Sequence, residues 1–235
     1  MKGGVLMDKQ TMKNLAAEAH ERLIGGISEK NGAVSSELAE EYAFFWFSRL
    51  IAVRYMQANG FDVGNVIFQA AVSESNEIWA AKFLDVCRRN KNVSAFFPDD
   101  EKYIIPSGLT GENGLVCAVL NEISDDVFCG NVQVIGWLYQ FFNSSTKSMV
   151  YSELKNNVKI SPEKIPAATQ IFTPDWIVQY MVENTLGKLW NDCGGGLGFE
   201  YCADFAESGN AGKRSPESIT FIDPCMGCGN ILVYA

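Results

Sequence analysis

The sequence predicts a mainly α-helical N-terminal domain followed by the start of a doubly wound α/β domain. Two observations carry this prediction. Apolar residues recur at helical spacing through much of residues 8–160, and residues 218–235 read as a short strand, a Gly-x-Gly loop and the first turn of a helix. The chain has 235 residues, 47% of them hydrophobic and 20% charged, which is enough to bury a core in one large domain or two small ones.

Composition favours a cytoplasmic protein and argues against bulk attraction to nucleic acid. The chain has 28 Asp+Glu against 19 Lys+Arg, a net charge of −9, whereas a duplex-binding surface needs clustered Lys and Arg. Seven scattered cysteines are typical of reduced thiols rather than of a disulfide framework. No apolar run approaches the roughly 18–20 residues of a membrane helix. The first seven residues are too short for the apolar segment and cleavage site of a signal peptide. We therefore expect no interaction with a membrane.

The first domain, expected over residues 8–160, is predicted from a series of helical segments. In the first of them Leu15, Ala19, Leu23 and Ile27 recur every four residues. Ser35 is predicted as the N-cap of a second helix that is rich in aromatic residues. Further helices are expected over residues 78–86, 115–123 and 132–142.

Charged residues in this domain are expected to have structural roles. Arg49 and Arg54 lie within the aromatic helix, and we expect them to extend to solvent or to pair with Glu40 and Glu41. The acidic pair at 125–126 lies between two later helices without the spacing of metal ligands. It is therefore expected to be a solvated loop.

A domain boundary is expected near residue 161, because residues 151–164 are polar and contain proline. The second domain, 161–235, would comprise a Thr-Pro helix over 173–191, a mobile linker rich in Gly and Ser over 192–217, and the first strand with its glycine loop over 218–235. A single strand is not stable alone in water. The tail after residue 191 is therefore expected to pack loosely on the helical domain or to pair with another copy.

The glycine loop follows an acidic residue at the end of the predicted strand Ile219–Asp223. Gly227 and Gly229 would let the backbone turn tightly and approach a ligand. The third glycine of the dinucleotide fingerprint is missing, and the carboxylate of Asp223 would repel a pyrophosphate, which disfavours an NAD-dependent dehydrogenase. A carboxylate here suits a cationic group, such as the ammonium or sulfonium of S-adenosylmethionine.

A second chemical signal lies at the start of the Thr-Pro helix. Thr173 is predicted as its N-cap and Pro174 as its first residue, and Asp175 favours the positive helix end. Alone, the segment indicates a well-capped amphipathic helix. Combined with the Asp-Pro-x-x-Gly-x-Gly segment fifty residues later, it favours a helix start that receives a ligand carboxylate through the Thr hydroxyl and free N–H groups.

The amino-acid sequences of both segments resemble the first two cofactor motifs of DNA methyltransferases that modify adenine at N6. The segments are Ile-Phe-Thr-Pro-Asp-Trp-Ile-Val and Asp-Pro-Cys-Met-Gly-Cys-Gly-Asn-Ile-Leu-Val-Tyr-Ala. Residues 165–192 and 219–235 are similar more narrowly to the adenine-specific methyltransferases of BREX phage-defence systems, the PglX type, whereas the helical region resembles them only in general character. The resemblance implies a Rossmann-like methyltransferase domain and S-adenosylmethionine as cofactor. The cofactor-binding residues that it implies are Phe172, Thr173, Pro174, Asp223, Pro224, Gly227, Gly229 and Asn230, with the role of Asn230 left open.

The resemblance also implies what this chain does not contain. The family's catalytic Asn/Asp-Pro-Pro-Tyr/Phe motif occurs nowhere in the sequence, so no catalytic residue is assigned. The implied function is the N-terminal part of an enzyme that methylates adenine N6 in duplex DNA during phage defence, inactive as this piece and contacting DNA through regions absent from it. The alternative is a non-catalytic helical module that binds partner proteins of a defence complex. Cys225 and Cys228 have no second pair at ligand spacing, so no metal is expected.

Overall fold

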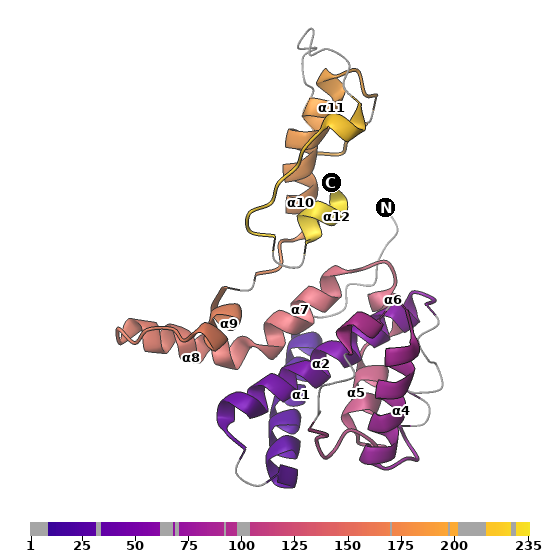
Figure 1. The fold of residues 1–235 in the computed structure, drawn as a ribbon, viewed down its shortest axis with the longest axis vertical. Coiled ribbons are helices and arrows are strands. Elements are labelled where there is room, and N and C mark those ends of the chain that lie inside the picture. Colours follow the sequence, from indigo (N-terminus) through magenta and orange to yellow (C-terminus); the bar gives the residue numbers. More distant parts are fainter. Residues whose placement is uncertain are drawn as a thin grey trace. The chain divides into compact units, whose positions relative to one another are not determined.

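The computed structural model describes residues 9–31, 34–61, 68, 71–91, 93–97, 104–169, 171–196, 198–201, 215–226 and 229–235. It divides the chain into two compact units, Met1–Thr169 and Gln170–Ala235. The described residues are mainly helical, and none of them is assigned to a strand (Figure 1). The predicted α domain is therefore confirmed, whereas the predicted strand Ile219–Asp223 is not formed.

The first unit is built from helices of unequal length. They are α1 (Lys9–Asn31), α2 (Ser36–Ala58), α4 (Asn76–Arg89), η1 (Ser94–Phe96), α5 (Leu115–Glu122), α6 (Asp125–Phe128), α7 (Gln133–Phe142), α8 (Ser144–Lys155), η2 (Pro162–Lys164) and α9 (Ile165–Thr169). The helices predicted over 78–86, 115–123 and 132–142 are confirmed as α4, α5 and α7. Helix α8 extends into the stretch predicted as a polar boundary, and it packs there against α9 (Figure 1).

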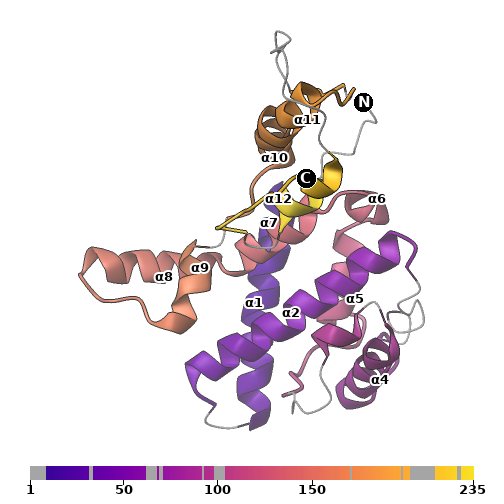
Figure 2. The same ribbon diagram turned by 45° about the horizontal axis from the view of Figure 1, so that its top comes forward.

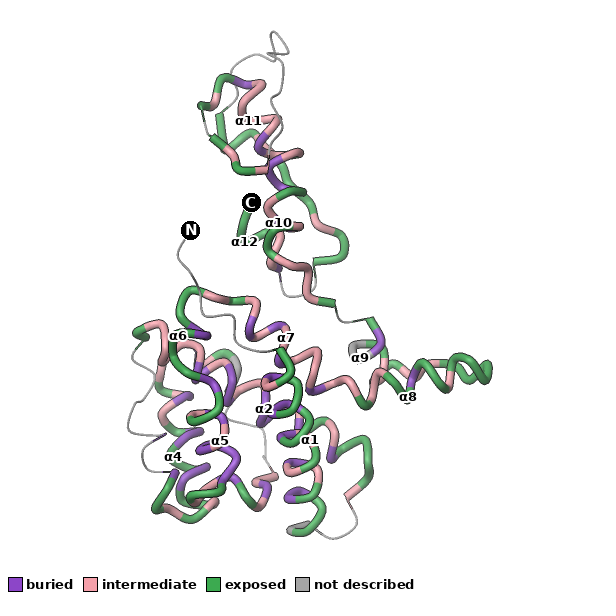
Figure 3. Tube along the Cα trace, turned by 180° about the vertical axis from the view of Figure 1, so that it is seen from behind, coloured by how far each residue is buried: buried purple, intermediate pink, exposed green. Residues whose placement is uncertain are grey.

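Helix α2 supplies much of the core of the first unit. The backbone N–H of Leu38 donates to Ser35 Oγ at 3.2 Å, which confirms the predicted N-cap. Trp46 and Phe47 are fully buried, and Phe47 stacks on Phe142 of α7 with ring centroids 4.3 Å apart. Helix α1 packs against both α2 and α7 (Figure 2), and the buried residues concentrate on α1, α2, α4 and α5 (Figure 3). Full burial of each large apolar side chain stabilises the fold by about 1.5–3 kcal/mol.

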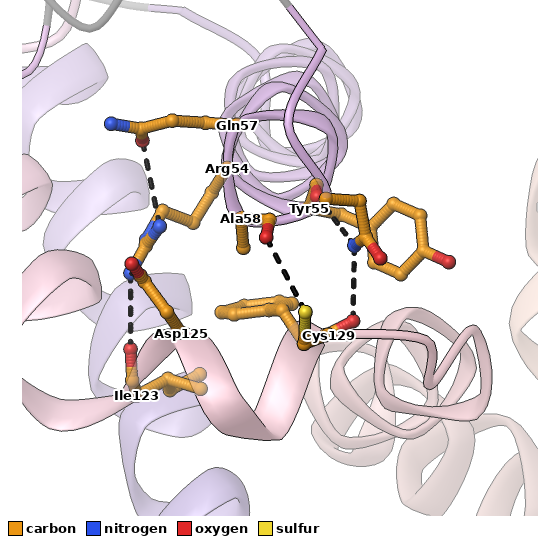
Figure 4. A network of polar contacts seen from close by, with 9 residues as sticks. Arg54, Tyr55, Gln57, Ala58, Ile123, Asp125 and Cys129 are labelled. Carbon is orange, nitrogen blue, oxygen red and sulfur yellow. Dashed lines mark hydrogen bonds and ion pairs between the residues drawn. The ribbon is translucent and has the colours of Figure 1, made fainter.

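A buried arginine joins α2 to the segment around α6 (Figure 4). Arg54 is only 4% exposed, and its guanidinium forms an ion pair with Asp125 and donates to the carbonyl of Ile123 at 3.5 Å. The expected pairing of Arg54 with the acidic residues at 40–41 is therefore wrong. The acidic pair at 125–126 is also not merely a solvated loop, because one of its members begins α6 and neutralises a buried cation.

Two further charged residues of α2, Glu40 and Arg49, have aromatic or imidazole partners. The Nε2 atom of His20 lies 2.9 Å from Glu40 Oε2, and the imidazole meets the ring of Phe142 edge to face at 5.0 Å. The guanidinium of Arg49 lies over the ring of Phe45, with its central carbon 3.5 Å from the ring centroid. Contacts with aromatic rings thus hold charged residues of this helix in place.

In the second unit, one long helix carries the other elements. This helix runs without a break through α10 (Asp175–Val182), the π-helical turn η3 (Glu183–Gly187) and α11 (Lys188–Asp192). Two short elements come later in the chain, η4 (Pro216–Ser218) and α12 (Asn230–Tyr234). Helix α12 packs against α10 (Figure 1). A strand needs a neighbour for its N–H and C=O groups, and the described part of this unit offers none to residues 219–223.

Residues 193–196 and 198–201 of the predicted mobile linker fold back on this long helix, whereas residues 197 and 202–214 of it lie outside the described residues. Gly195 lies so close to the indole of Trp190 that a Cβ at this position would be 2.0 Å from Trp190 Nε1. The ring of Phe199 likewise lies against Gly187. The described residues after 191 therefore contact the helix of their own unit, a packing that the prediction for the tail did not include.

Neither a membrane helix nor a metal cluster emerges from the described residues. None of the described helices has the length and apolar character needed to cross a membrane. In the same residues, no group of three or more His, Cys, Asp and Glu side chains is placed to hold a metal ion. Cys225 is exposed, and Cys228 lies outside the described residues.

Candidate cofactor site

The first predicted cofactor segment leads into α10. The helix begins at Asp175, and its N-cap is Pro174, whose carbonyl accepts the N–H of Ile177 at 2.9 Å. Thr173 is therefore not the N-cap, and Pro174 is not the first helical residue, because the extended ψ of 144° at Pro174 delays the turn into the helix by one residue. Phe172 and Thr173 lie half-buried just before the cap.

The second segment begins with the carboxylate of Asp223. Its Oδ1 accepts the backbone N–H of Cys225 at 2.9 Å and closes a turn that contains Pro224. Its Oδ2 is buried and has no hydrogen-bond partner among the described residues. A buried carboxylate oxygen without a donor is costly, so a donor group that reached this atom would stabilise the turn.

Gly229 joins this turn to α12. Its φ of +84° is left-handed, a conformation that residues with a Cβ rarely adopt, and its N–H donates to the carbonyl of Met226 at 2.9 Å. Its own carbonyl accepts the N–H of Val233, so it starts the helix that contains Asn230 as its first residue. Gly229 therefore forms a tight turn, as predicted, through its left-handed backbone conformation. Gly227 lies outside the described residues.

A buried glutamate fastens α12 to the long helix. Glu183, 3% exposed in the π-helical turn, accepts the phenol O–H of Tyr234 on Oε1 at 2.8 Å. Its Oε2 accepts the backbone N–H of Tyr201 at 2.6 Å, and Asn184 donates to the carbonyl of Tyr201 at 2.9 Å. One carboxylate therefore ties together the helix after the glycine loop, the long helix and the returning segment. The contact joins the two helices that follow the predicted cofactor segments.

The phenol of Tyr234 is held in its neutral form. Desolvation, followed by the hydrogen bond and charge of Glu183 and by the charge of Glu200, raises the pKa of Tyr234 to about 12. The hydroxyl thus remains a donor to the carboxylate across the physiological range.

A cavity of about 740 Å³ lies beside this contact, within the second unit. Leu186, Trp190, Phe199, Phe221 and Tyr234 are among its lining residues, which are mostly apolar. None of the predicted cofactor residues lines it, so the cavity and the turn at Asp223 are separate features. The turn, with its orphaned oxygen, remains the better candidate for a charged ligand.

Glu183 and Tyr234 lie within the two segments that resemble the family, but the sequence analysis assigns neither of them a role. A signal for Glu183 does exist, because it is an acidic residue placed among apolar positions such as Val182 and Leu186. Its partner could not be inferred, since the two side chains are 51 residues apart and meet only after the tail folds back.

The chain is similar to two curated adenine-specific methyltransferases. It is 28% identical over 264 residues to adenine-specific methyltransferase PglX of Lacticaseibacillus casei (strain Zhang), which covers 85% of this chain and 22% of that protein. It is 28% identical over 267 residues to adenine-specific methyltransferase BrxX of Escherichia coli O9:H4 (strain HS), covering 92% of this chain and 21% of that protein. No family model matches the chain.

These similarities confirm the resemblance to adenine-specific methyltransferases of the BREX type and extend it. They cover most of the chain, including much of the helical region, and not only residues 165–192 and 219–235. The chain spans about a fifth of the length of the curated relatives that it matches.

Proposed function

We propose that the chain is the N-terminal part of an enzyme that transfers a methyl group from S-adenosylmethionine to adenine N6 in duplex DNA, in bacterial phage defence. The observation that carries this proposal is the similarity to adenine-specific methyltransferases along most of the chain. The orphaned oxygen of Asp223 supports it independently, because the cofactor is a cation at its sulfonium and at its ammonium group.

The cofactor would supply an electrophilic methyl group, and the residues of this chain would bind and orient it. Asp223 would accept hydrogen bonds from the ammonium group through the oxygen that has no partner, while Cys225 N–H holds the other oxygen in place. Gly229 would keep the loop open through its left-handed backbone. The remaining proposed contacts are Phe172, Thr173 and Pro174 before α10, and Pro224, Gly227 and Asn230 in the loop.

No residue of this chain is proposed to act on the base. Activation and stacking of a flipped adenine belong, in this proposal, to the Asn/Asp-Pro-Pro-Tyr/Phe motif that the sequence lacks. The 235-residue chain is accordingly expected to show no turnover in a radiolabelled methyl-transfer assay on plasmid DNA. Clear turnover by the chain alone contradicts this part of the proposal.

The test of the cofactor site is Asp223→Asn in the intact, longer protein. Loss of a charge-assisted hydrogen bond costs about 1.5–3 kcal/mol, so calorimetry should show S-adenosylmethionine binding weakened by about 10- to 150-fold. Glu217→Gln, which removes an exposed carboxylate of the same unit, is the matched control and should leave binding unchanged. Equal affinities for both variants contradict the assignment of Asp223. Absence of methyl transfer by the intact protein favours the alternative, a non-catalytic interaction module.

A further inference from the structure

A hollow in the first unit lies where α7 ends and α8 begins, and none of the predicted cofactor residues lines it. It has a volume of about 580 Å³. Gln140 and Phe141 of α7 line it together with one face of α8, which contributes Lys147, Tyr151, Lys155 and three serines. We call this hollow the α8 lysine groove.

The groove is a local exception in an acidic chain. No carboxylate is among the described residues that line it. Lys147 and Lys155 form no ion pair with any described residue, whereas Lys164 pairs with Glu153 at 2.8 Å. At 100° per residue, Glu153 falls on the face of α8 opposite to Tyr151 and Lys155, so it does not neutralise the groove. Two uncompensated positive charges therefore share one hollow of a protein with a net charge of −9.

The spacing of the groove residues suits a repeating anion. Lys147 and Lys155 are eight residues apart on one helix, a rise of about 12 Å. One strand of duplex DNA advances about 3.4 Å per phosphate along the helix axis, so the backbone positions of the two lysines are separated by a length of about three to four nucleotides. Ser144, Ser148 and Ser152 recur every four residues along the same face. The hydroxyl of Ser148 donates to the carbonyl of Ser144 at 2.9 Å, so Ser144 and Ser152 are the hydroxyls suited to donate to phosphate oxygens.

We propose that the α8 lysine groove contacts the sugar-phosphate backbone of duplex DNA, in addition to the contacts expected from regions absent from this chain. The inference rests on the proposed function, which makes duplex DNA the substrate of the intact protein. Contacts of this kind carry no base specificity, so the groove would add affinity and orient the helical unit on the duplex. It differs from bulk attraction, which the net charge of the chain disfavours, because it depends on two defined side chains.

The test measures binding of the 235-residue chain to a fluorescently labelled duplex of about 20 base pairs by anisotropy, between 50 and 200 mM salt. Lys147→Gln and Lys155→Gln should each weaken binding about eightfold at 0.1 M salt and flatten the slope of log K against log salt by about 0.9. Lys91→Gln changes the net charge by the same amount at an exposed site after α4, and it should have little effect. The Lys147→Arg, Lys155→Arg double variant keeps both charges and should retain binding, which separates an effect of charge from an effect on folding.

Several outcomes overturn the inference. They are absence of binding by the unaltered chain, an equal loss in Lys91→Gln, or a preference for phosphatidylglycerol vesicles over DNA that depends on the same lysines. Failure of the groove is distinguishable from failure of the proposed function in the intact protein. If methyl transfer proceeds with an unchanged KM for DNA in the Lys147→Gln, Lys155→Gln double variant, only the groove is wrong. If the unaltered intact protein transfers no methyl group, the proposed function itself is wrong.

Discussion

Replacement of Tyr234 by Phe tests whether a single hydroxyl holds the helix after the glycine loop in place. The hydroxyl donates to Glu183 Oε1 at 2.8 Å, and Glu183 is 3% exposed, so the substitution removes a hydrogen bond to a buried carboxylate without changing the shape of the ring. Hydrogen bonds to charged groups contribute about 1.5–3 kcal/mol. Because Tyr201 N–H still donates to the other oxygen, we expect a loss near the lower end, about 2 kcal/mol.

The assay is amide hydrogen exchange, because it reports local opening of α12 separately from unfolding of the rest of the chain. The N–H of Val233 bonds to the carbonyl of Gly229, and the N–H of Ala235 to that of Ile231. A loss of 2 kcal/mol should accelerate exchange of both amides by about 30-fold.

The matched control is Tyr201→Phe. Tyr201 contacts Glu183 through its backbone N–H, so removal of its phenol oxygen leaves that hydrogen bond intact and should leave the exchange of α12 unchanged. A double-mutant cycle with Glu183→Gln then gives the coupling energy between the two side chains. Unchanged exchange in Tyr234→Phe, or equal acceleration in both Phe variants, refutes the reasoning.

Two further predictions concern the packing of each unit. Gly195→Ala brings a Cβ to 2.0 Å from Trp190 Nε1, so we expect a loss of about 1–3 kcal/mol and a shift in tryptophan emission, whereas Gly196→Ala meets no atom within 4 Å and should be neutral in urea unfolding. Burial, opposed by the weaker effect of a nearby cation, raises the pKa of Tyr139 to about 12, and its hydroxyl donates to the carbonyl of Ser48 at 2.9 Å. The folded pKa exceeds the unfolded value of 10, so the neutral phenol of Tyr139 contributes about 2–3 kcal/mol to the free energy of unfolding. This stabilisation is fully present below pH 10 and is lost as the pH rises through 12. Urea unfolding between pH 9 and 12 should show that loss of stability, and Tyr139→Phe should remove the part of the pH dependence that comes from Tyr139. An identical pH dependence in both proteins contradicts the prediction.

Features that depend on neighbouring residues could be predicted from the sequence. The cap at Ser35 needs only the N–H of Leu38, three residues away, and the helices around 115–122 and 133–142 follow from apolar spacing. The left-handed backbone of Gly229 also follows from the residue type and its place before a helix. These elements were predicted to within a residue or two because local rules determine them.

Features that depend on distant residues could not be predicted in this way. Arg54 meets Asp125 across 71 residues, and Glu183 meets Tyr234 across 51, so nothing in either local segment identifies the partner. The strand expected at Ile219–Asp223 is a similar case, because strand formation depends on a neighbouring strand and not only on β-branched composition. The cofactor motif can be recognised from its amino-acid sequence, whereas the absence of a hydrogen-bond partner for Asp223 Oδ2 follows only from the folded turn.

The π-helical turn at Glu183–Gly187 limits which deletions the long helix of the second unit can tolerate. One residue of an α-helix corresponds to a rotation of about 100°, so a deletion that restores regular winding in this turn would rotate α11 by that angle relative to α10. Helix α10 contacts α12, while Gly187 and Trp190 contact the returning segment, and both contacts require the present rotation. Relatives that lose a residue here should therefore carry a compensating change in the returning segment.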